Sequence, residues 1–152
     1  APGRLQLSYS IPGPNQSAVS LDVTWSNKTA TRLAESTWIS FEPNHETRRT
    51  WQMHTLGSWI SPYAVVENGT RHIFSVWDGV RLVEEPAMKR SMPQTELPRP
   101  SFLIQALDSP LLSFTDINHL IWYDGTSSPP RPSDPAAAAH FNLHNNLWGT
   151  AF

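Results

Sequence analysis

Apolar residues recur at every second position over residues 5–11 and again over residues 19–25. This spacing places the apolar side chains of a β-strand on one face, whereas a helix would need a period near 3.6. Pro12-Gly13-Pro14-Asn15 separates the two runs and is typical of a turn. The pattern therefore predicts strands with one apolar face, and it predicts that Trp25 is buried on the inner face of its strand.

Further runs of this kind, separated by turn residues, continue along the chain. Asn68-Gly69 and Asp78-Gly79 suit type I′ hairpin turns, and together they predict a three-stranded meander. Two proline-rich stretches, residues 84–101 and 124–139, predict long loops. The other predicted strands are 36–41, 51–56, 63–67, 70–77, 80–83, 102–107, 117–123 and 141–146.

About ten short strands without a long amphipathic helix predict an all-β fold, a two-layer antiparallel β-sandwich of supersandwich-like type. The length of 152 residues suits a single β-sandwich domain over 1–152. Because the chain begins at Ala1 without a methionine, we expect a fragment or processed part of a larger protein.

The composition excludes several classes of partner. Charged residues make up 16% of the chain and the formal net charge is −2, with no long basic run. We therefore expect no nucleic-acid partner and no membrane partner. Cysteine is absent, so no disulfide or thiolate metal site can form. The seven tryptophans suit either a β-sheet core or flat platforms for sugar rings.

No motif for a reaction centre is present in the sequence. His140 and His144 are four residues apart, a spacing that would place them on one face of a strand or helix. Neither the HExxH spacing nor a nucleophile elbow occurs. We therefore predict no metal ligand, no cofactor and no catalytic residue in this chain. Glu35, before Trp38, and Asp108, before a proline, can each brace a turn or contact a ligand.

Residues 140–150 form the most unusual segment of the sequence. Asparagine side chains both donate and accept hydrogen bonds, and tryptophan offers a stacking face, which together suit sugar hydroxyls and rings. A strand followed by a glycine-containing turn is the alternative interpretation of this segment. The candidate ligand-binding residues are Glu35, Asp108, Asn145, Asn146 and Trp148.

Three Asn-x-Ser/Thr sequons begin at Asn15, Asn27 and Asn68, each in a predicted turn. Turns are where a glycan can be accepted. The sequons predict a secreted, extracellular glycoprotein.

Four segments occur together in one order: residues 32–41 (RLAESTWISF), 56–62 (LGSWISP), 107–111 (LDSPL) and 142–150 (NLHNNLWGT). With them, residues 5 to 152 resemble the C-terminal β region of large bacterial and fungal proteins related to the α-mannosidase-like glycoside hydrolases. Much of that family carries a domain-of-unknown-function label. The chain departs from the family pattern at Ala34, where proline is usual, and at Phe152, where relatives continue with another aromatic segment.

The resemblance implies a non-catalytic β-sandwich of a carbohydrate-active enzyme, because in that superfamily a separate N-terminal domain carries the zinc-held reaction site. The sandwich would pack against that catalytic domain and lend loops to a sugar-binding cleft. The parent protein would be a glycoside hydrolase, while the isolated chain would be inactive. A free-standing carbohydrate-binding module and a purely structural or interaction module are the alternatives.

Overall fold

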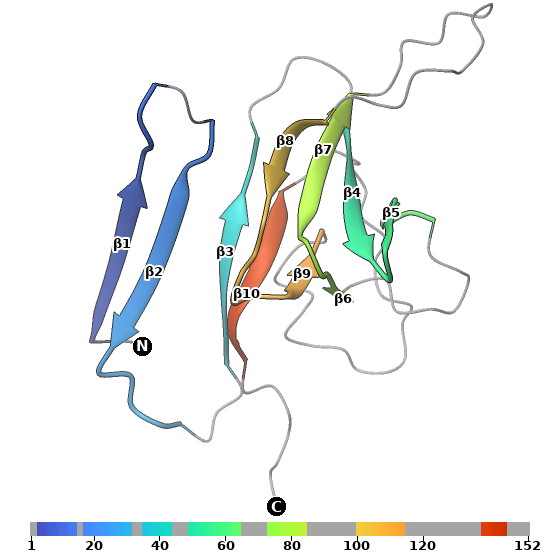
Figure 1. Ribbon diagram of the computed structural model, residues 1–152. Helices are drawn as coiled ribbons and strands as arrows, with labels where there is room; N and C mark the ends of the chain where they lie inside the picture. The colour runs from blue at the N-terminus through green and yellow to red at the C-terminus, as the bar shows by residue number, and fades with distance from the viewer. Residues whose placement is uncertain are drawn as a thin grey trace, which may run out of the picture. The chain divides into compact units, whose positions relative to one another are not determined.

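The computed structural model describes residues 3–14, 17–31, 35–43, 49–64, 73–84, 100–114 and 138–145. These residues form ten β-strands in antiparallel sheets, and no helix occurs among them (Figure 1). The prediction of an all-β antiparallel fold is confirmed. In the same ranges, no helix is long and apolar enough to cross a membrane. The strands are β1 (Arg4–Ser10), β2 (Ser20–Ser26), β3 (Ser36–Phe41), β4 (Arg49–Thr55), β5 (Ser58–Ile60), β6 (Phe74–Ser75), β7 (Val80–Glu84), β8 (Pro100–Ile104), β9 (Leu111–Ser113) and β10 (Ala139–Asn145).

The chain divides into two compact units, residues 1–33 and residues 34–150, each described by itself. The prediction of a single domain over 1–152 stays a prediction. The first unit is the antiparallel hairpin of β1 and β2. Its register brings the apolar positions of both strands onto one face, with the pairs Leu5–Trp25, Leu7–Val23 and Tyr9–Leu21. The alternation predicted for both strands is thus observed, but Trp25 is only half-buried and its predicted burial is not reached.

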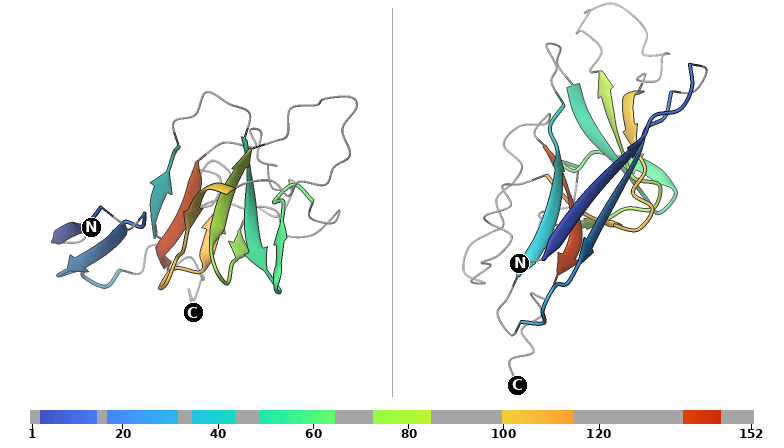
Figure 2. Two further views of the ribbon diagram at one scale, coloured as in Figure 1. Left: turned by 45° about the horizontal axis from the view of Figure 1, so that its top comes forward. Right: turned by 90° about the vertical axis from the view of Figure 1, so that its left-hand side faces the viewer.

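The second unit contains two four-stranded sheets. The first sheet has the order β3-β10-β9-β6 and the second has the order β5-β4-β7-β8. Figure 2 shows from two further sides that β3 and β10 lie side by side in the first sheet. Pro100, which cannot donate a backbone hydrogen bond, opens β8 at an edge of the second sheet.

One buried cluster joins the two sheets of this unit and makes it a sandwich. Trp51 and Leu82 come from the second sheet, and Leu112 and Phe141 come from the first. Phe114 follows β9 and packs against Trp51 with the ring centroids 6.0 Å apart. Each strand contributes alternate residues to this core, because successive side chains of a strand point to opposite faces. The polar residues between them therefore lie on the outer faces.

The turn between β4 and β5 is a two-residue hairpin loop that the sequence analysis did not single out. Leu56 and Gly57 form it, with φ values of 49° and 79°, and Thr55 pairs with Ser58 across it. Positive φ at both central positions is typical of a type I′ turn. Glycine at the second position and high exposure of Leu56 make this turn possible.

The predicted meander around Asp78-Gly79 is wrong. β6 pairs with β9 in the first sheet, whereas β7 pairs with β4 and β8 in the second. Residues 76–79 therefore cross between the two sheets instead of closing a hairpin. The positive φ that suggested the turn is present at Gly79, at 102°, but it serves the crossover. Asn68-Gly69, the other predicted turn, lies outside the described residues.

The predicted buried strand at 102–107 is also only partly right. β8 ends at Ile104, and Phe102 and Leu103 are about half exposed. β9 was not predicted, because its three residues carry no alternation. Strand 117–123, residues 124–137 of the predicted loop at 124–139 and most of the loop at 84–101 lie outside the described residues. Ala139, at the end of that predicted loop, already belongs to β10.

Candidate functional site

Polar and aromatic side chains line the outer face of the second sheet of the second unit. In β4, Trp51 and Met53 point into the core, so Gln52 points outward. Gln52 is paired with Arg81 of β7, and Arg81 Nε donates a hydrogen bond to Gln52 Oε1 at 2.8 Å. The Arg81 guanidinium carbon lies 4.4 Å from the centre of the Trp59 ring. The guanidinium is thus fixed by a hydrogen bond and a cation–π contact.

His54 continues this arrangement along β4. It is paired with Trp59, and their ring centroids are 5.0 Å apart. His54 Nδ1 lies 3.1 Å from Asp78 Oδ2, a distance that suits an ion pair when the imidazole is protonated. The contact is close in distance but is not a well-directed hydrogen bond. We call Gln52, His54, Trp59, Asp78 and Arg81 the outer-face row.

The crossover between the sheets holds Asp78 near His54. The backbone nitrogen of Trp77 donates to the carbonyl of His54 at 3.0 Å, and the nitrogen of His54 donates to the carbonyl of Gly79 at 3.0 Å. A Cβ on Gly79 would stand 1.9 Å from the carbonyl oxygen of Ile104. Only glycine therefore allows the crossover to lie so close to β8.

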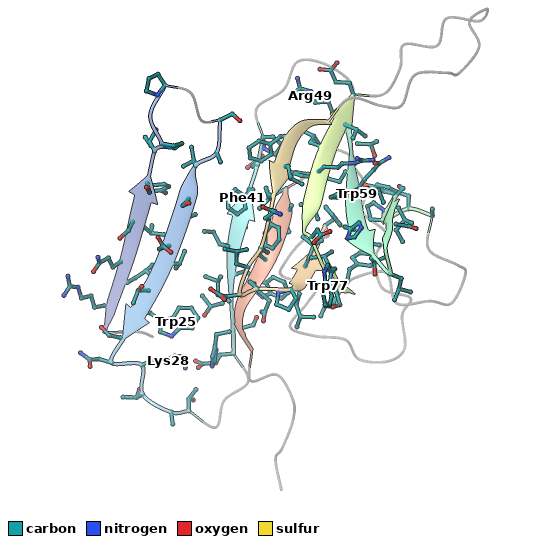
Figure 3. All side chains as sticks on the ribbon, in the orientation of Figure 1. Trp25, Lys28, Phe41, Arg49, Trp59 and Trp77 are labelled. Carbon is teal, nitrogen blue, oxygen red and sulfur yellow. The ribbon has the colours of Figure 1, made fainter. Side chains whose placement is uncertain are left out.

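Trp77 borders the outer-face row and is the most exposed tryptophan of the described chain, at 83%. Figure 3 labels Trp59 beside β4 and β5, and Trp77 at the lower end of the unit. Trp77 directly precedes Asp78, and its backbone is bonded to that of His54, so an exposed stacking face belongs to the same segment as these hydrogen-bonding groups. These are the groups that recognise sugar rings and their hydroxyls.

The structure describes three of the sequence-predicted ligand residues and brings two of them, Glu35 and Asn145, to one end of the first sheet. Glu35 is half-buried and directly precedes β3, whose first residue, Ser36, pairs with Asn145 at the end of β10. Asp108 is exposed before β9, and the hydroxyl of its neighbour Ser109 donates to the carbonyl of Asn142 in β10. The end of β10 thus meets the beginning of β3, whereas β9 pairs with His140 and Phe141 near the start of β10. Asn146 and Trp148 lie outside the described residues.

A β-bulge in β10 overturns the prediction that His140 and His144 share a face. His140 pairs with Ser40 and His144 pairs with Thr37, with a register shift between residues 142 and 144. Ser40 and Thr37 are three residues apart in a continuous strand, so the two histidines lie on opposite faces. Asn142 Nδ2 donates to the carbonyl of His144 at 3.2 Å across the bulge. A bulge inserts one residue and inverts the alternation beyond it.

Within the described ranges, no group of three or more histidine, aspartate or glutamate side chains could hold a metal ion. Two residues of the outer-face row, Gln52 and Arg81, were missed by the sequence analysis, and Trp77 was considered there only as a strand residue. The available signal was the alternation of polar Gln52 and His54 with apolar Trp51 and Met53 in β4.

Searches of protein-family models, of curated proteins and of solved structures found no match to this chain.

Proposed function

We propose that this chain is a non-catalytic β-sandwich part of a secreted, carbohydrate-active protein and that it contacts sugar through the outer-face row and Trp77. The carrying observation is the exposed Trp77, which directly precedes Asp78 in the chain and whose backbone nitrogen donates to the carbonyl of His54. A sugar ring stacks on an aromatic face by its C–H groups, while carboxylates, amides and imidazoles bond its hydroxyls. We therefore expect the outer-face row and Trp77 to recognise a sugar and not to supply a reaction centre.

The contacts of the Arg81 side chain indicate that this surface is preorganised for binding. Arg81 is fixed at Gln52 and at the Trp59 ring before any ligand arrives. Binding then costs less side-chain entropy than it would for a freely rotating arginine. Because the guanidinium already covers one side of Trp59, Trp77 is the residue that we expect to stack on the sugar.

The proposed partners are the catalytic domain of the same or an associated protein, which would be a glycoside hydrolase, and a carbohydrate. The hairpin of the first unit supports the protein partner, because Leu5, Leu7 and Tyr9 are each about half exposed or more on its apolar face. A two-stranded hairpin is marginal when nothing covers its apolar face. The intact mass of the naturally produced protein tests whether the chain continues into such a domain.

Calorimetric titration of the whole chain with oligomers of mannan, chitin and cellulose tests the sugar proposal. We expect at least one of them to bind, and we expect Trp77→Ala to weaken that binding about tenfold or more, as loss of a central aromatic contact does. Leu56→Ala is the matched control, since Leu56 is 99% exposed in a neighbouring turn and lies outside the outer-face row. Equal affinity of the Trp77→Ala variant, or no binding to any of the three glycans, would contradict the proposal.

The alternative is a structural or interaction module, which the absence of sugar binding would favour. Assay of the isolated chain with aryl glycosides separates both from an enzyme. We expect no turnover, and sustained turnover that follows the chain through purification would refute the non-catalytic assignment.

A further inference from the structure

The segment that follows β2 carries a complete glycosylation sequon, Asn27-Lys28-Thr29. Of the three sequons in the sequence, it is the one that lies wholly within the described residues. The requirement for the reaction is chemical: an accessible asparagine amide with a threonine or serine hydroxyl two residues later and no proline between them. Residues 27–29 meet the sequence part of this requirement, and the structure shows their exposure and backbone conformation.

Exposure alternates along the sequon in the sense that the reaction needs. Asn27 and Thr29 are exposed, whereas Lys28 between them is half-buried. The side-chain amide and the hydroxyl thus both face solvent, while the intervening residue is turned toward the protein. A bulky glycan on Asn27 would then extend into solvent without displacing a packed side chain.

The backbone at Asn27 projects its side chain beyond the sheet. The last paired residues of the hairpin are Arg4 and Ser26, so Asn27 lies one residue past the ladder. Its φ of 59° is in the left-handed region, which asparagine adopts more readily than most residues. No neighbouring strand residue is paired with it.

Gly3 provides the room beside this side chain. A Cβ built on Gly3 would lie 3.0 Å from the Cβ of Asn27, which is tighter than nearly all real contacts of this kind. The absence of a side chain at Gly3 therefore leaves the Cβ of Asn27 uncrowded at its base.

From these observations we infer that Asn27 is an acceptor of an N-linked glycan. Nδ2 of Asn27 forms a bond to the anomeric carbon of an oligosaccharide carried on a lipid pyrophosphate. The bond between that carbon and the pyrophosphate breaks, the lipid pyrophosphate leaves, and the amide gives up one proton. The inference does not depend on sugar binding by the outer-face row, because the glycan here is attached covalently in the first unit.

The test expresses the whole chain behind a secretory signal in eukaryotic cells. The secreted protein is treated with a peptide N-glycosidase in ¹⁸O water, which converts each glycosylated asparagine into labelled aspartate, and peptides are identified by mass spectrometry. We expect label at Asn27. A secreted chain whose Asn27 peptide is entirely unlabelled would overturn the inference.

Three variants test whether glycosylation depends on the asparagine and the hydroxyl residue of the sequon. Asn27→Gln and Thr29→Ala should each remove one glycan from the intact mass, whereas Thr29→Ser should keep it, because serine supplies the same hydroxyl. Unchanged glycan number in Thr29→Ala would also overturn the inference. Should a variant fail to be secreted, labelling of Asn27 in the unaltered chain decides the question alone.

Discussion

Replacement of Gly79 by alanine should destabilise the second unit far more than the same change at Gly57. Both glycines have positive φ, 102° at Gly79 and 79° at Gly57. They differ in surroundings: a Cβ on Gly57 would meet nothing within 4 Å, whereas a Cβ on Gly79 would meet the oxygen of Ile104 at 1.9 Å. Comparison of the two variants therefore separates the cost of a positive φ from the cost of a clash between the new Cβ and the backbone of Ile104.

The expected loss can be estimated from these two terms. Left-handed backbone costs a residue other than glycine about 1–2 kcal/mol, and this is the whole effect expected for Gly57→Ala. At Gly79 the strain is about 1–3 kcal/mol. The collision adds about 1–3 kcal/mol, as overpacking does, because the backbone at Ile104 must move. The total of about 2–6 kcal/mol is a large part of the whole stability of a small domain, which is about 5–15 kcal/mol.

Urea unfolding, followed by tryptophan fluorescence at equilibrium, measures both losses by linear extrapolation. Trp51 is buried in the core and reports on the second unit. We expect Gly57→Ala to fold with a modest shift of the midpoint and Gly79→Ala to lose at least twice as much free energy or to remain unfolded. Equal losses for the two variants would refute the argument that the crossover is pressed against β8.

Two further changes test the packing and the bulge by the same measurement. Trp51→Ala should cost about 3–5 kcal/mol, because the side chain is 1% exposed at the centre of the sandwich, and a loss under ~1 kcal/mol, typical of ordinary substitutions, would show that the core is wrongly assigned. Asn142→Ala should cost about 0.5–1.5 kcal/mol, because it removes the hydrogen bond from the Asn142 amide to the His144 carbonyl at the bulge; no measurable change would show that this hydrogen bond does not stabilise the bulge.

The fold class could be predicted because alternation is a local property of the chain. In β2 each apolar residue is followed by a polar one, and the strand, Ser20–Ser26, coincides with the alternating residues 19–25. The partner of a strand is not local. Val80 follows the Asp78-Gly79 turn signal, but it pairs with Met53 and Ile104, far away in sequence. Turn chemistry alone could not distinguish a hairpin from a crossover between sheets.

The candidate site was predictable only in part for the same reason. Glu35, Asp108 and Asn145 were singled out from the sequence, and the antiparallel pairing of β3 and β10 brings Glu35 and Asn145 to one end, whereas Asp108 precedes β9, which pairs nearer the start of β10. Gln52 and Arg81 of the outer-face row were missed because register alone brings them side by side. The bulge in β10 was also unpredictable, since Leu143 suits a regular strand as well as a bulged one.

β4 carries both the core and the proposed binding surface on alternate residues. Trp51 and Met53 fill one face, and Gln52 and His54 belong to the outer-face row on the other. Changes outside the core should therefore alter binding while the packing contacts stay in place. Trp77, being 83% exposed, contributes little packing, so its replacement by alanine should leave the free energy of unfolding within about 0.5 kcal/mol. A loss of sugar binding at unchanged stability then belongs to recognition. Parallel losses of both would mean that the indole braces the crossover instead, and the sugar-binding proposal would lose its carrying observation.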